Sequence, residues 1–342
     1  MSKILQKTLA ILLIFSFCGC SAADRKPEAH SSRFFAMDTV MEISVYSEED
    51  SETLLNACRN RVTELDGLLS FHNASGDIWK LNHSSGSVVA VSPDTLTVLR
   101  ASSEICGLSC GAFNIATGAL TELWGFETDS PSIPDGQDLR ALLPLPGPEC
   151  LRFRDGGVSL ESPASVNLGA IAKGYCSDEL SILIKQNGIE SALISLGGNI
   201  SAVGSKPDGS PWRIAVQDPS DPAGYIGVVS VRDRSVITSG CYQRYFTEAG
   251  KDYHHILDPE TGFPAESGLL SVTVVSGSGM YADALSTCFF VLGIRDSVSL
   301  LDRLPDHIRP DGILFVSDDH TVQIAGNLDF DPADGISCTQ LS

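Results

Sequence analysis

The sequence predicts an α+β protein with mixed, largely antiparallel sheets and packed helices. Of the 342 residues, 43% are hydrophobic and only 19% are charged. This composition is typical of a packed globular protein rather than of a disordered one. Strand-like runs follow one another at short intervals with few helices between them, whereas a doubly wound parallel sheet would alternate the two. At roughly 150 residues per domain, the length allows about two domains or one large one.

Residues 1–19 are predicted to form a lipoprotein signal peptide. Lys3 and Lys7 precede an apolar run over 9–15 that is too short to span a membrane. The residues after it, 17–21, resemble a bacterial lipobox, in which the cysteine, here Cys20, is lipidated and becomes the mature N-terminus. An ordinary cleaved signal is the alternative. Because no later apolar run is expected to reach membrane-spanning length, we expect a lipid-anchored body on the extracytoplasmic or periplasmic side of the membrane.

The remaining chain divides into a tether, a body and a tail. We expect a polar tether over 20–32, a body over 33–330 and a tail over 331–342. A loop-rich excursion near 128–150, rich in Pro, Gly and Asp, is a point at which the body could divide into two lobes. Helical spacing predicts helices over 51–69, 93–107, 170–187, 280–291 and 295–303. Strands are predicted over 40–46, 151–154, 157–160, 192–196, 212–217, 226–231, 235–239, 269–276 and 313–316.

The charge balance limits the ligands that this chain can bind. It has 23 Lys and Arg against 43 Asp and Glu, a formal charge of −20, which disfavours nucleic acid. An anionic ligand would need local compensation from a metal ion, a lysine or helix N-termini. The ten cysteines form no CxxC pair and are scattered, several of them in apolar stretches. We therefore predict mostly free structural thiols.

A first candidate site lies at 167–175, where an extended segment passes through Gly169 into a helix. The first turn of a helix presents free N–H groups to an anion, and Lys173 adds a full positive charge. The alternative is a plain junction between a loop and a helix with a solvated lysine. The spacing of a P-loop is absent.

A second candidate pairs Asp283 with Thr287 on one face of a predicted helix, because they are four residues apart. A carboxylate and a hydroxyl in this arrangement are hard-oxygen ligands that suit Mg²⁺. In the alternative interpretation, Asp283 stabilises the helix N-terminus and Thr287 donates to a carbonyl of its own helix.

A third candidate is the pair His254 and His255, which follows a strand-like run. Adjacent strand residues point to opposite faces, so one metal ion could not easily take both side chains. One inward histidine suits proton transfer, and the alternative is a hydrogen-bonded structural histidine. The glycine pair in 195–199 permits either close backbone approach to a ligand or a simple turn.

These candidates and several further motifs, taken in their order along the chain, resemble the pattern of the FAD:protein FMN transferase family, the ApbE family of flavin transferases. The resemblance runs from about Phe35 to Gly293. Its landmarks are 37–39 (MDT), 69–72 (LSFH), 111–114 (GAFN), 123–126 (LWGF), 167–175 (NLGAIAKGY), 196–198 (LGG), Trp212, 238–240 (TSG), 255–259 (HILDP) and 282–284 (ADA). So many landmarks in one order make a chance match improbable.

The resemblance implies an ApbE-like, T-fold-related architecture and an enzyme that uses FAD as its substrate and Mg²⁺ as its cofactor. It implies transfer of the FMN moiety to a Thr or Ser hydroxyl of an acceptor flavoprotein, with release of AMP. By the family pattern, Asp283, Thr287 and the carbonyl of Ala170 bind Mg²⁺, and His255 and Lys173 are the catalytic pair. The positions implied to contact the flavin or nucleotide are Met37, His72, Ala112, Phe113, Asn114, Asn167, Lys173 and Ile256.

The sequence departs from the family pattern at a few of these positions. His72 stands where the family commonly has a stacking Tyr, Asn114 and Asn167 stand where acidic residues are common, and Asp38 stands where Gly is usual. The chain lacks a complete acceptor motif, because the segment that begins at Asp283 ends in Cys288 and Phe289. We therefore expect modification of another protein, a membrane-associated redox subunit.

Three other functions remain open at this point. An FAD pyrophosphatase would use the same metal site and produce free FMN and AMP, with water in place of the acceptor hydroxyl. A lipid-anchored flavin-binding protein without turnover would not need the Asp283 and Thr287 pair, and a solute-binding lipoprotein would need neither that pair nor His255.

Overall fold

A nine-stranded sheet forms the centre of the molecule. The computed structural model describes residues 27–341, so the predicted signal peptide and Cys20 lie outside the described residues. The strands, in their order across the sheet, are β1 (Glu28–Ala36), β2 (Thr39–Ser47), β5 (Ser191–Leu196), β6 (Asn199–Gly204), β9 (Ser235–Gly240), β12 (Leu269–Ser276), β13 (Gly312–Ser317), β14 (Val322–Gly326) and β16 (Cys338–Gln340). Neighbours are antiparallel except β14 and β16, which are parallel. The expectation of a largely antiparallel α+β fold is confirmed.

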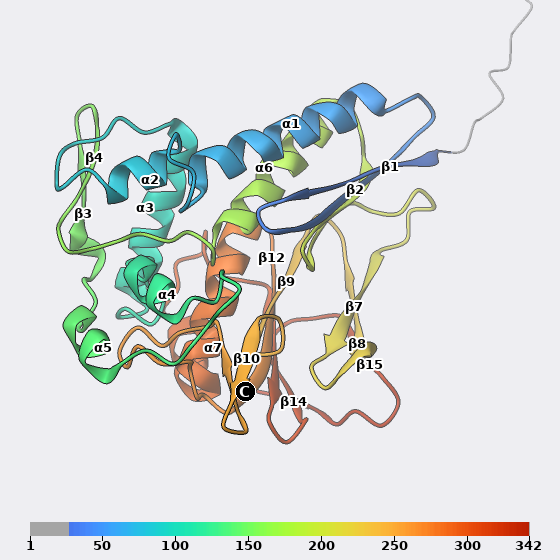
Figure 1. Ribbon diagram of the computed structural model, residues 1–342. Coiled ribbons are helices and arrows are strands. Elements are labelled where there is room, and N and C mark those ends of the chain that lie inside the picture. Colours follow the sequence, from blue (N-terminus) through green and yellow to red (C-terminus); the bar gives the residue numbers. More distant parts are fainter. Residues whose placement is uncertain (1–26, 342) are drawn as a thin grey trace, which may run out of the picture.

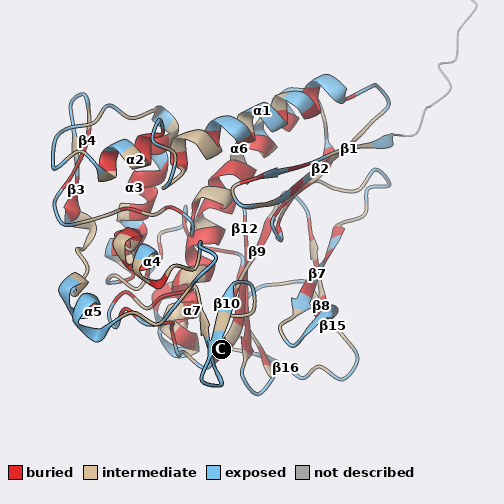
Figure 2. Cartoon of the chain, in the orientation of Figure 1, coloured by how far each residue is buried: buried red, intermediate tan, exposed pale blue. Residues whose placement is uncertain are grey.

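Three long helices cover one face of this sheet: α1 (Glu52–Leu69), α6 (Ala172–Gln186) and α7 (Gly279–Leu301) (Figure 1). Alternate residues of β2, Met41, Ile43 and Val45, are fully buried and belong to the same apolar core as these helices. Figure 2 shows buried residues concentrated along α6, α7 and the central strands. The main core therefore lies between the sheet and the helix layer.

A smaller three-stranded sheet covers part of the other face. It contains β7 (Trp212–Asp218), β8 (Asp221–Val231) and β15 (Phe330–Pro332). Val236 of β9 packs in this second core, whereas the next residue, Ile237, packs in the main core. Both residues are at most 3% exposed, so β9 is buried on both faces.

The remaining elements form a region beside α7. The helices are α2 (Asp77–Asn82), α3 (Pro93–Leu108), α4 (Gly118–Trp124), α5 (Gly136–Leu142) and the 3₁₀ turn η1 (Pro148–Cys150). The hairpins are β3 (Leu151–Arg154) with β4 (Gly157–Leu160), and β10 (Tyr245–Glu248) with β11 (Lys251–His254). Trp124 is fully buried, stacks on Phe126 and donates through Nε1 to the carbonyl of Gly262 at 2.8 Å. This contact fixes the loop that follows β11.

The predicted boundaries differ from the structure at three places. The polar tether is shorter than expected, because β1 begins at Glu28 and pairs with β2 along its whole length. The predicted tail contains part of β15 and all of β16, which pair with β8 and β14. The segment 128–150, expected to be rich in loops, contains α5 and the 3₁₀ turn at 148–150.

The two helices predicted over 280–291 and 295–303 correspond to the two parts of α7, which is interrupted at Gly293, where the backbone is not helical and φ is 71°. By length and composition α7 could cross a membrane, with a mean hydropathy of 1.5 over its most apolar window, which contradicts our expectation of no such run. Half of that window is buried, and Phe289 and Phe290 lie fully buried in the main core. The structure therefore uses α7 as a core helix.

The cysteines agree with the prediction of free thiols. All eight cysteines in residues 27–341 are unpaired, and five of them are buried. Burial raises the pKa of the Cys176 and Cys288 thiols to about 12, so both are held in the protonated, unreactive form.

Candidate active site

Several of the predicted site residues lie at one end of the central sheet. The turn between β1 and β2 (Met37 and Asp38) and the turn between β5 and β6 (Gly197 and Gly198) lie there, because Met41 pairs with Leu196. Figure 1 shows the first of these turns close to the place where α6 and α7 meet. The last residues of β9 extend to the same end. Segments far apart in sequence thus surround the N-terminal parts of α6 and α7.

Asp283 is a buried carboxylate held by two neutral donors. Its side chain is on α7, and the residue is 5% exposed. Its Oδ2 accepts from the backbone N–H of Gly174 at 2.9 Å, and its Oδ1 accepts from Nδ2 of Asn199 at 3.0 Å. Among residues 27–341, no Lys, Arg or His nitrogen lies within 4.0 Å of it. The carboxylate therefore has hydrogen bonds but no ion-pair partner.

This environment favours a bound cation. Burial raises the pKa of Asp283 above its usual value, and the positive charge of Lys173 opposes that rise. A buried charge without a partner is costly, and a cation that binds there removes the cost. The two donors orient the carboxylate without neutralising it.

Gly174 makes the close approach of α6 and α7 possible. A Cβ atom at this position would lie 2.2 Å from the carbonyl oxygen of Gly279 and 2.6 Å from Cβ of Asp283. Gly174 is the third residue of α6, so its N–H has no partner within the helix, and it donates to Asp283 and not to the carbonyl of Ala170. The Ala170 carbonyl is therefore not engaged by this N–H and is available to a ligand at the start of α6.

Thr287 lies one turn after Asp283 on α7 and is half-buried. Its Oγ1 lies 3.1 Å from Oγ of Ser239, at the end of β9. Residues 27–341 contain no cluster of three or more His, Cys, Asp or Glu side chains that could hold a metal ion. A carboxylate, a hydroxyl and a carbonyl are instead the sparse oxygen ligands that Mg²⁺ takes when phosphates and water complete its shell. The residues present therefore fit Mg²⁺.

His255 follows β11 and carries a neutral imidazole. Its Nδ1 lies 3.2 Å from the carbonyl oxygen of Arg244, and because a carbonyl only accepts, Nδ1 holds the ring proton. The Nε2 lone pair is then free. Burial, together with the positive charges of Arg244 and Lys173, lowers the pKa of His255 to about 4. The geometry describes a proton acceptor at neutral pH.

The neighbouring His254 has a structural role. Its Nε2 lies 3.2 Å from the carbonyl oxygen of Ala265, and its ring packs edge-on against Phe290 in the main core. Burial lowers its pKa. The two histidines therefore face different surroundings, which agrees with the sequence argument that one metal ion would not take both.

Lys173 and Arg244 supply the positive charge at this end of the sheet. Lys173 is in the first turn of α6, and its Nζ donates to the carbonyl of Gly169 at 3.3 Å. Arg244 is exposed, and its Nη2 donates to the carbonyl of Asp38 at 3.4 Å. Because both charges act on the pKa of His255, the three side chains belong to one electrostatic site.

The positions implied to contact flavin differ in their exposure. Met37 is half-buried at the β1–β2 turn with φ at 45°, and its N–H donates to Oδ2 of Asp66 at 3.1 Å. Ile256 is 5% exposed. His72 is exposed, and its Nε2 lies 2.8 Å from Oε2 of Glu127. These residues stay predictions as flavin contacts.

The segments 112–114 and 167–170 lie next to each other. The N–H of Asn167 donates to the carbonyl of Ile115 at 2.8 Å. The side chain of Asn114 donates to the carbonyl of Pro146 at 2.9 Å, and that of Asn167 accepts from the N–H of Gly169 at 2.8 Å, so both amides hold loop backbone. Ala112 is half-buried, but Phe113 is only 1% exposed and its N–H donates to Ser109 Oγ at 3.1 Å, so this residue belongs to the core.

Sequence reasoning missed three side chains at this site: Asn199, Ser239 and Arg244. Asn199 directly follows the glycine pair that indicated a close approach, and Ser239 lies in a motif already noted as a landmark. Their partners on α7 are 84 and 48 residues away in the sequence. No local pattern predicts such contacts.

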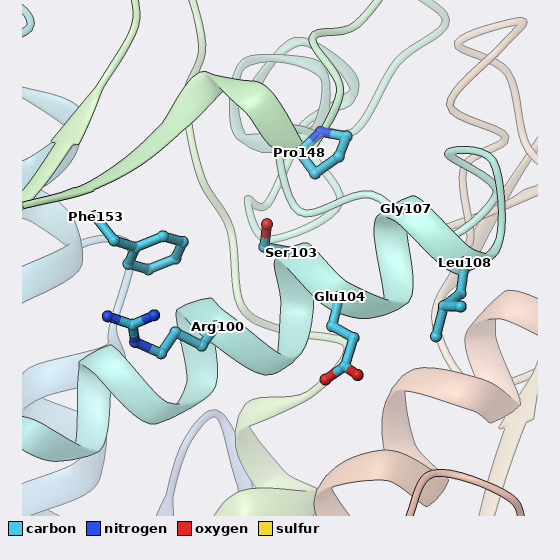
Figure 3. Close-up of a pocket in the computed structure, with 7 residues that line it drawn as sticks. All are labelled: Arg100, Ser103, Glu104, Gly107, Leu108, Pro148 and Phe153. Carbon is cyan, nitrogen blue, oxygen red and sulfur yellow. The ribbon is translucent and has the colours of Figure 1, made fainter. Parts of the chain in front are cut away.

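An open hollow in the described surface lies away from this site. It has a volume of roughly 540 Å³ and is lined by Arg100, Ser103, Glu104, Gly107, Leu108, Pro148 and Phe153 (Figure 3). None of the predicted site residues lines it. Arg100 lies over the ring of Phe153, 4.5 Å from its centroid, and so covers apolar surface there.

Comparison with known proteins gives a consistent result. Residues 37–309 match the model of the ApbE family. The chain is 34% identical to an FAD:protein FMN transferase of Treponema pallidum over 319 residues, which cover 86% of this chain and 88% of that protein. It is 35% identical to an FAD:protein FMN transferase of Vibrio cholerae over 249 residues, 71% of this chain and 75% of that protein.

Solved structures show the same likeness. The ApbE protein of Thermotoga maritima superposes with a TM-score of 0.79 at 30% identity and covers 86% of this chain and 96% of its own. The apo form of the flavinyl transferase ApbE of Pseudomonas stutzeri gives a TM-score of 0.74 at 29% identity, over 85% of this chain and 91% of its own. The chain therefore belongs to the ApbE family.

Proposed function

We propose that this protein is a Mg²⁺-dependent enzyme that transfers the FMN moiety of FAD to a Thr or Ser hydroxyl of an acceptor flavoprotein and releases AMP. The observation that carries the proposal is the arrangement of Asp283, Thr287, Lys173 and His255 at one end of the sheet. The relatives named FAD:protein FMN transferase support the same reaction.

The site can compensate the negative charge of a pyrophosphate. Lys173 and Arg244 place two cations close to His255, and α6 directs its N-terminal end to the same place. Asp283, Thr287 and the carbonyl of Ala170 would hold Mg²⁺, which when bound neutralises phosphate charge. On a chain with a net charge of −20, this local positive charge is what admits an anionic substrate.

His255 would accept the proton of the attacking hydroxyl. The acceptor oxygen forms a bond to the FMN-side phosphorus while the bond from that phosphorus to the bridging oxygen breaks, and AMP leaves with that oxygen. The hydroxyl proton passes to Nε2 of His255, because Nδ1 already carries a proton that the Arg244 carbonyl accepts. Lys173 stabilises the charge that develops on the phosphate oxygens.

Localisation and the acceptor are also part of the proposal. A lipid on Cys20 would anchor the protein to the membrane, facing the extracytoplasmic or periplasmic side, where a membrane redox subunit is the expected acceptor. The motif at 17–21 is the sequence feature that supports the anchor. Metabolic labelling with a fatty acid, compared between the native chain and Cys20→Ala, tests it.

The reaction is tested with the full-length chain in detergent, FAD, Mg²⁺ and an acceptor domain, followed by intact mass spectrometry. A gain equal to FMN on the acceptor is expected, and Asp283→Ala or removal of Mg²⁺ should abolish it. Asp334→Ala, which removes an exposed carboxylate near the C-terminus, is the matched control and should retain activity.

The two other outcomes point to the alternatives. Free FMN and AMP with an unmodified acceptor would identify an FAD pyrophosphatase, in which water takes the place of the hydroxyl. FAD that stays intact and bound would identify a flavin-binding protein without turnover.

A further inference from the structure

Three hydroxyl groups and one carbonyl form a continuous chain of hydrogen bonds between α7 and β9. Ser286 Oγ donates to the backbone carbonyl of Asp283 at 2.8 Å. Ser239 Oγ lies 2.7 Å from Ser286 Oγ and 3.1 Å from Thr287 Oγ1. Ser286 is fully buried and Ser239 is half-buried, so the chain crosses from the helix to the sheet inside the protein.

The direction of every bond in this chain is determined by its carbonyl end. A hydroxyl has one proton to donate and a carbonyl has none. Because Ser286 uses its proton for the Asp283 carbonyl, Ser239 must donate in the bond to Ser286. Ser239 then has no proton left, so Thr287 must donate in the bond to Ser239. The Thr287 oxygen therefore offers only lone pairs to any other partner.

This behaviour differs from that of three other threonines in the helices. Thr63, Thr97 and Thr121 each donate to the carbonyl four residues earlier in their own helix, at 2.9 to 3.0 Å. For Thr287 that carbonyl belongs to Asp283, and Ser286 already donates to it. The Thr287 proton goes across to β9 instead.

We propose that Ser239 and Ser286 are positioning residues that fix the Thr287 hydroxyl as an acceptor-only ligand for a divalent cation. The proposal rests on the proposed function, since it assigns the cation to Asp283 and Thr287. A cation needs an oxygen lone pair and is repelled by a hydroxyl proton that points towards it. Because Ser239 accepts the Thr287 proton, the Thr287 hydroxyl does not have to rotate when the cation binds.

Binding of Mn²⁺ alone to the full-length chain in detergent tests the proposal without any catalytic readout. Free Mn²⁺ is followed by electron paramagnetic resonance, and Asp283→Ala defines the background. Ser239→Ala should weaken binding by about 10- to 100-fold, the range found for residues that orient metal ligands. Ser239→Thr, which keeps the hydroxyl, should restore most of the affinity.

A neighbouring hydroxyl pair supplies the matched control. Thr238 Oγ1 lies 2.8 Å from Thr273 Oγ1, on the adjacent strand β12. Thr238→Val removes a hydrogen bond of the same kind from the adjacent position of β9 without touching Thr287, and it should bind Mn²⁺ like the native chain. Chemical denaturation of Ser239→Ala and Thr238→Val shows whether a loss of Mn²⁺ affinity comes from a loss of stability.

Ser286→Ala tests the proton order itself. Ser239 then has a free proton and can donate to Thr287, so affinity should fall, and the double variant with Ser239→Ala should bind no more weakly than Ser239→Ala alone. Native affinity in Ser239→Ala would overturn this inference and leave the proposed function intact. If the native chain shows no binding that depends on Asp283, both the proposed metal site and this inference fail.

Discussion

Substitution of Gly174 by Ala should destabilise the protein and impair metal binding, although alanine is the better helix former. The new Cβ would lie 2.2 Å from the Gly279 carbonyl oxygen, whereas ordinary contacts exceed 3 Å, so α6 and α7 must separate by about 1 Å. Overpacking of this kind costs about 1–3 kcal/mol. The same movement would lengthen the 2.9 Å bond between the Gly174 N–H and Asp283 beyond hydrogen-bonding distance, a loss of about 1.5–3 kcal/mol for a charged acceptor.

The higher helix propensity of alanine offsets only about 0.5–1 kcal/mol of this loss, so we expect a net loss of about 1.5–5.5 kcal/mol in the free energy of unfolding. Gly67→Ala in α1 is the control, because its Cβ would meet only Asn73 Nδ2, at 3.6 Å. That variant should gain about 0.5–1 kcal/mol. Urea denaturation and Mn²⁺ titration measure both quantities. A Gly174→Ala protein as stable as the native chain, with native Mn²⁺ affinity, would refute the packing argument.

Three further substitutions test the packing around the site and the proposed base. Trp124→Phe leaves the Gly262 carbonyl without its donor and should lower the free energy of unfolding by about 1–3 kcal/mol in urea denaturation. Asp178→Ala removes the carboxylate that accepts from the first N–H groups of α7, so a loss of about 1–2 kcal/mol is expected by the same method. His255→Gln should lower the rate of FMN transfer by about 100- to 10,000-fold while FAD affinity, measured by fluorescence quenching, stays near native. Retained transfer in His255→Gln would remove this residue from the mechanism.

Local patterns predicted the long elements well. The helical spacing over 51–69 and 93–107 corresponds to α1 and α3 within one residue at each end, and strands such as β9 and β12 were predicted within one residue. The hairpin of β10 and β11 was missed because its short strands are largely exposed and polar and so carry no core pattern. The first part of β1, residues 28–32, falls in the predicted tether because those residues are mostly polar, and the pairing of β1 with β2 is visible only in the fold.

Part of the site can be predicted from the sequence, and the rest cannot for a related reason. Asp283 and Thr287 share one helix face, so their spacing alone brings them together, and the structure agrees. The position of Asn199 depends on the glycine turn before it. Gly197 has φ at 63°, and a Cβ there would lie 2.6 Å from the side chain of Thr39, so only glycine lets this turn approach the β1–β2 hairpin. Such approaches between distant segments are set by packing and not by local sequence.

The electrostatics of the site link substrate binding to the strength of the base. In the free protein, burial and the charges of Arg244 and Lys173 hold the pKa of His255 at about 4, so His255 is neutral, and able to accept a proton, above that pH. A pyrophosphate that pairs with the same two cations cancels part of their effect, and the pKa of His255 should rise towards its ordinary value of about 6.5. The acid limb of kcat/KM reports the free enzyme and that of kcat reports the complex, so the limb of kcat should lie at the higher pH. Each unit of separation corresponds to about 1.4 kcal/mol of interaction between substrate and protonated His255. Coincident limbs would show that Lys173 and Arg244 do not meet the pyrophosphate.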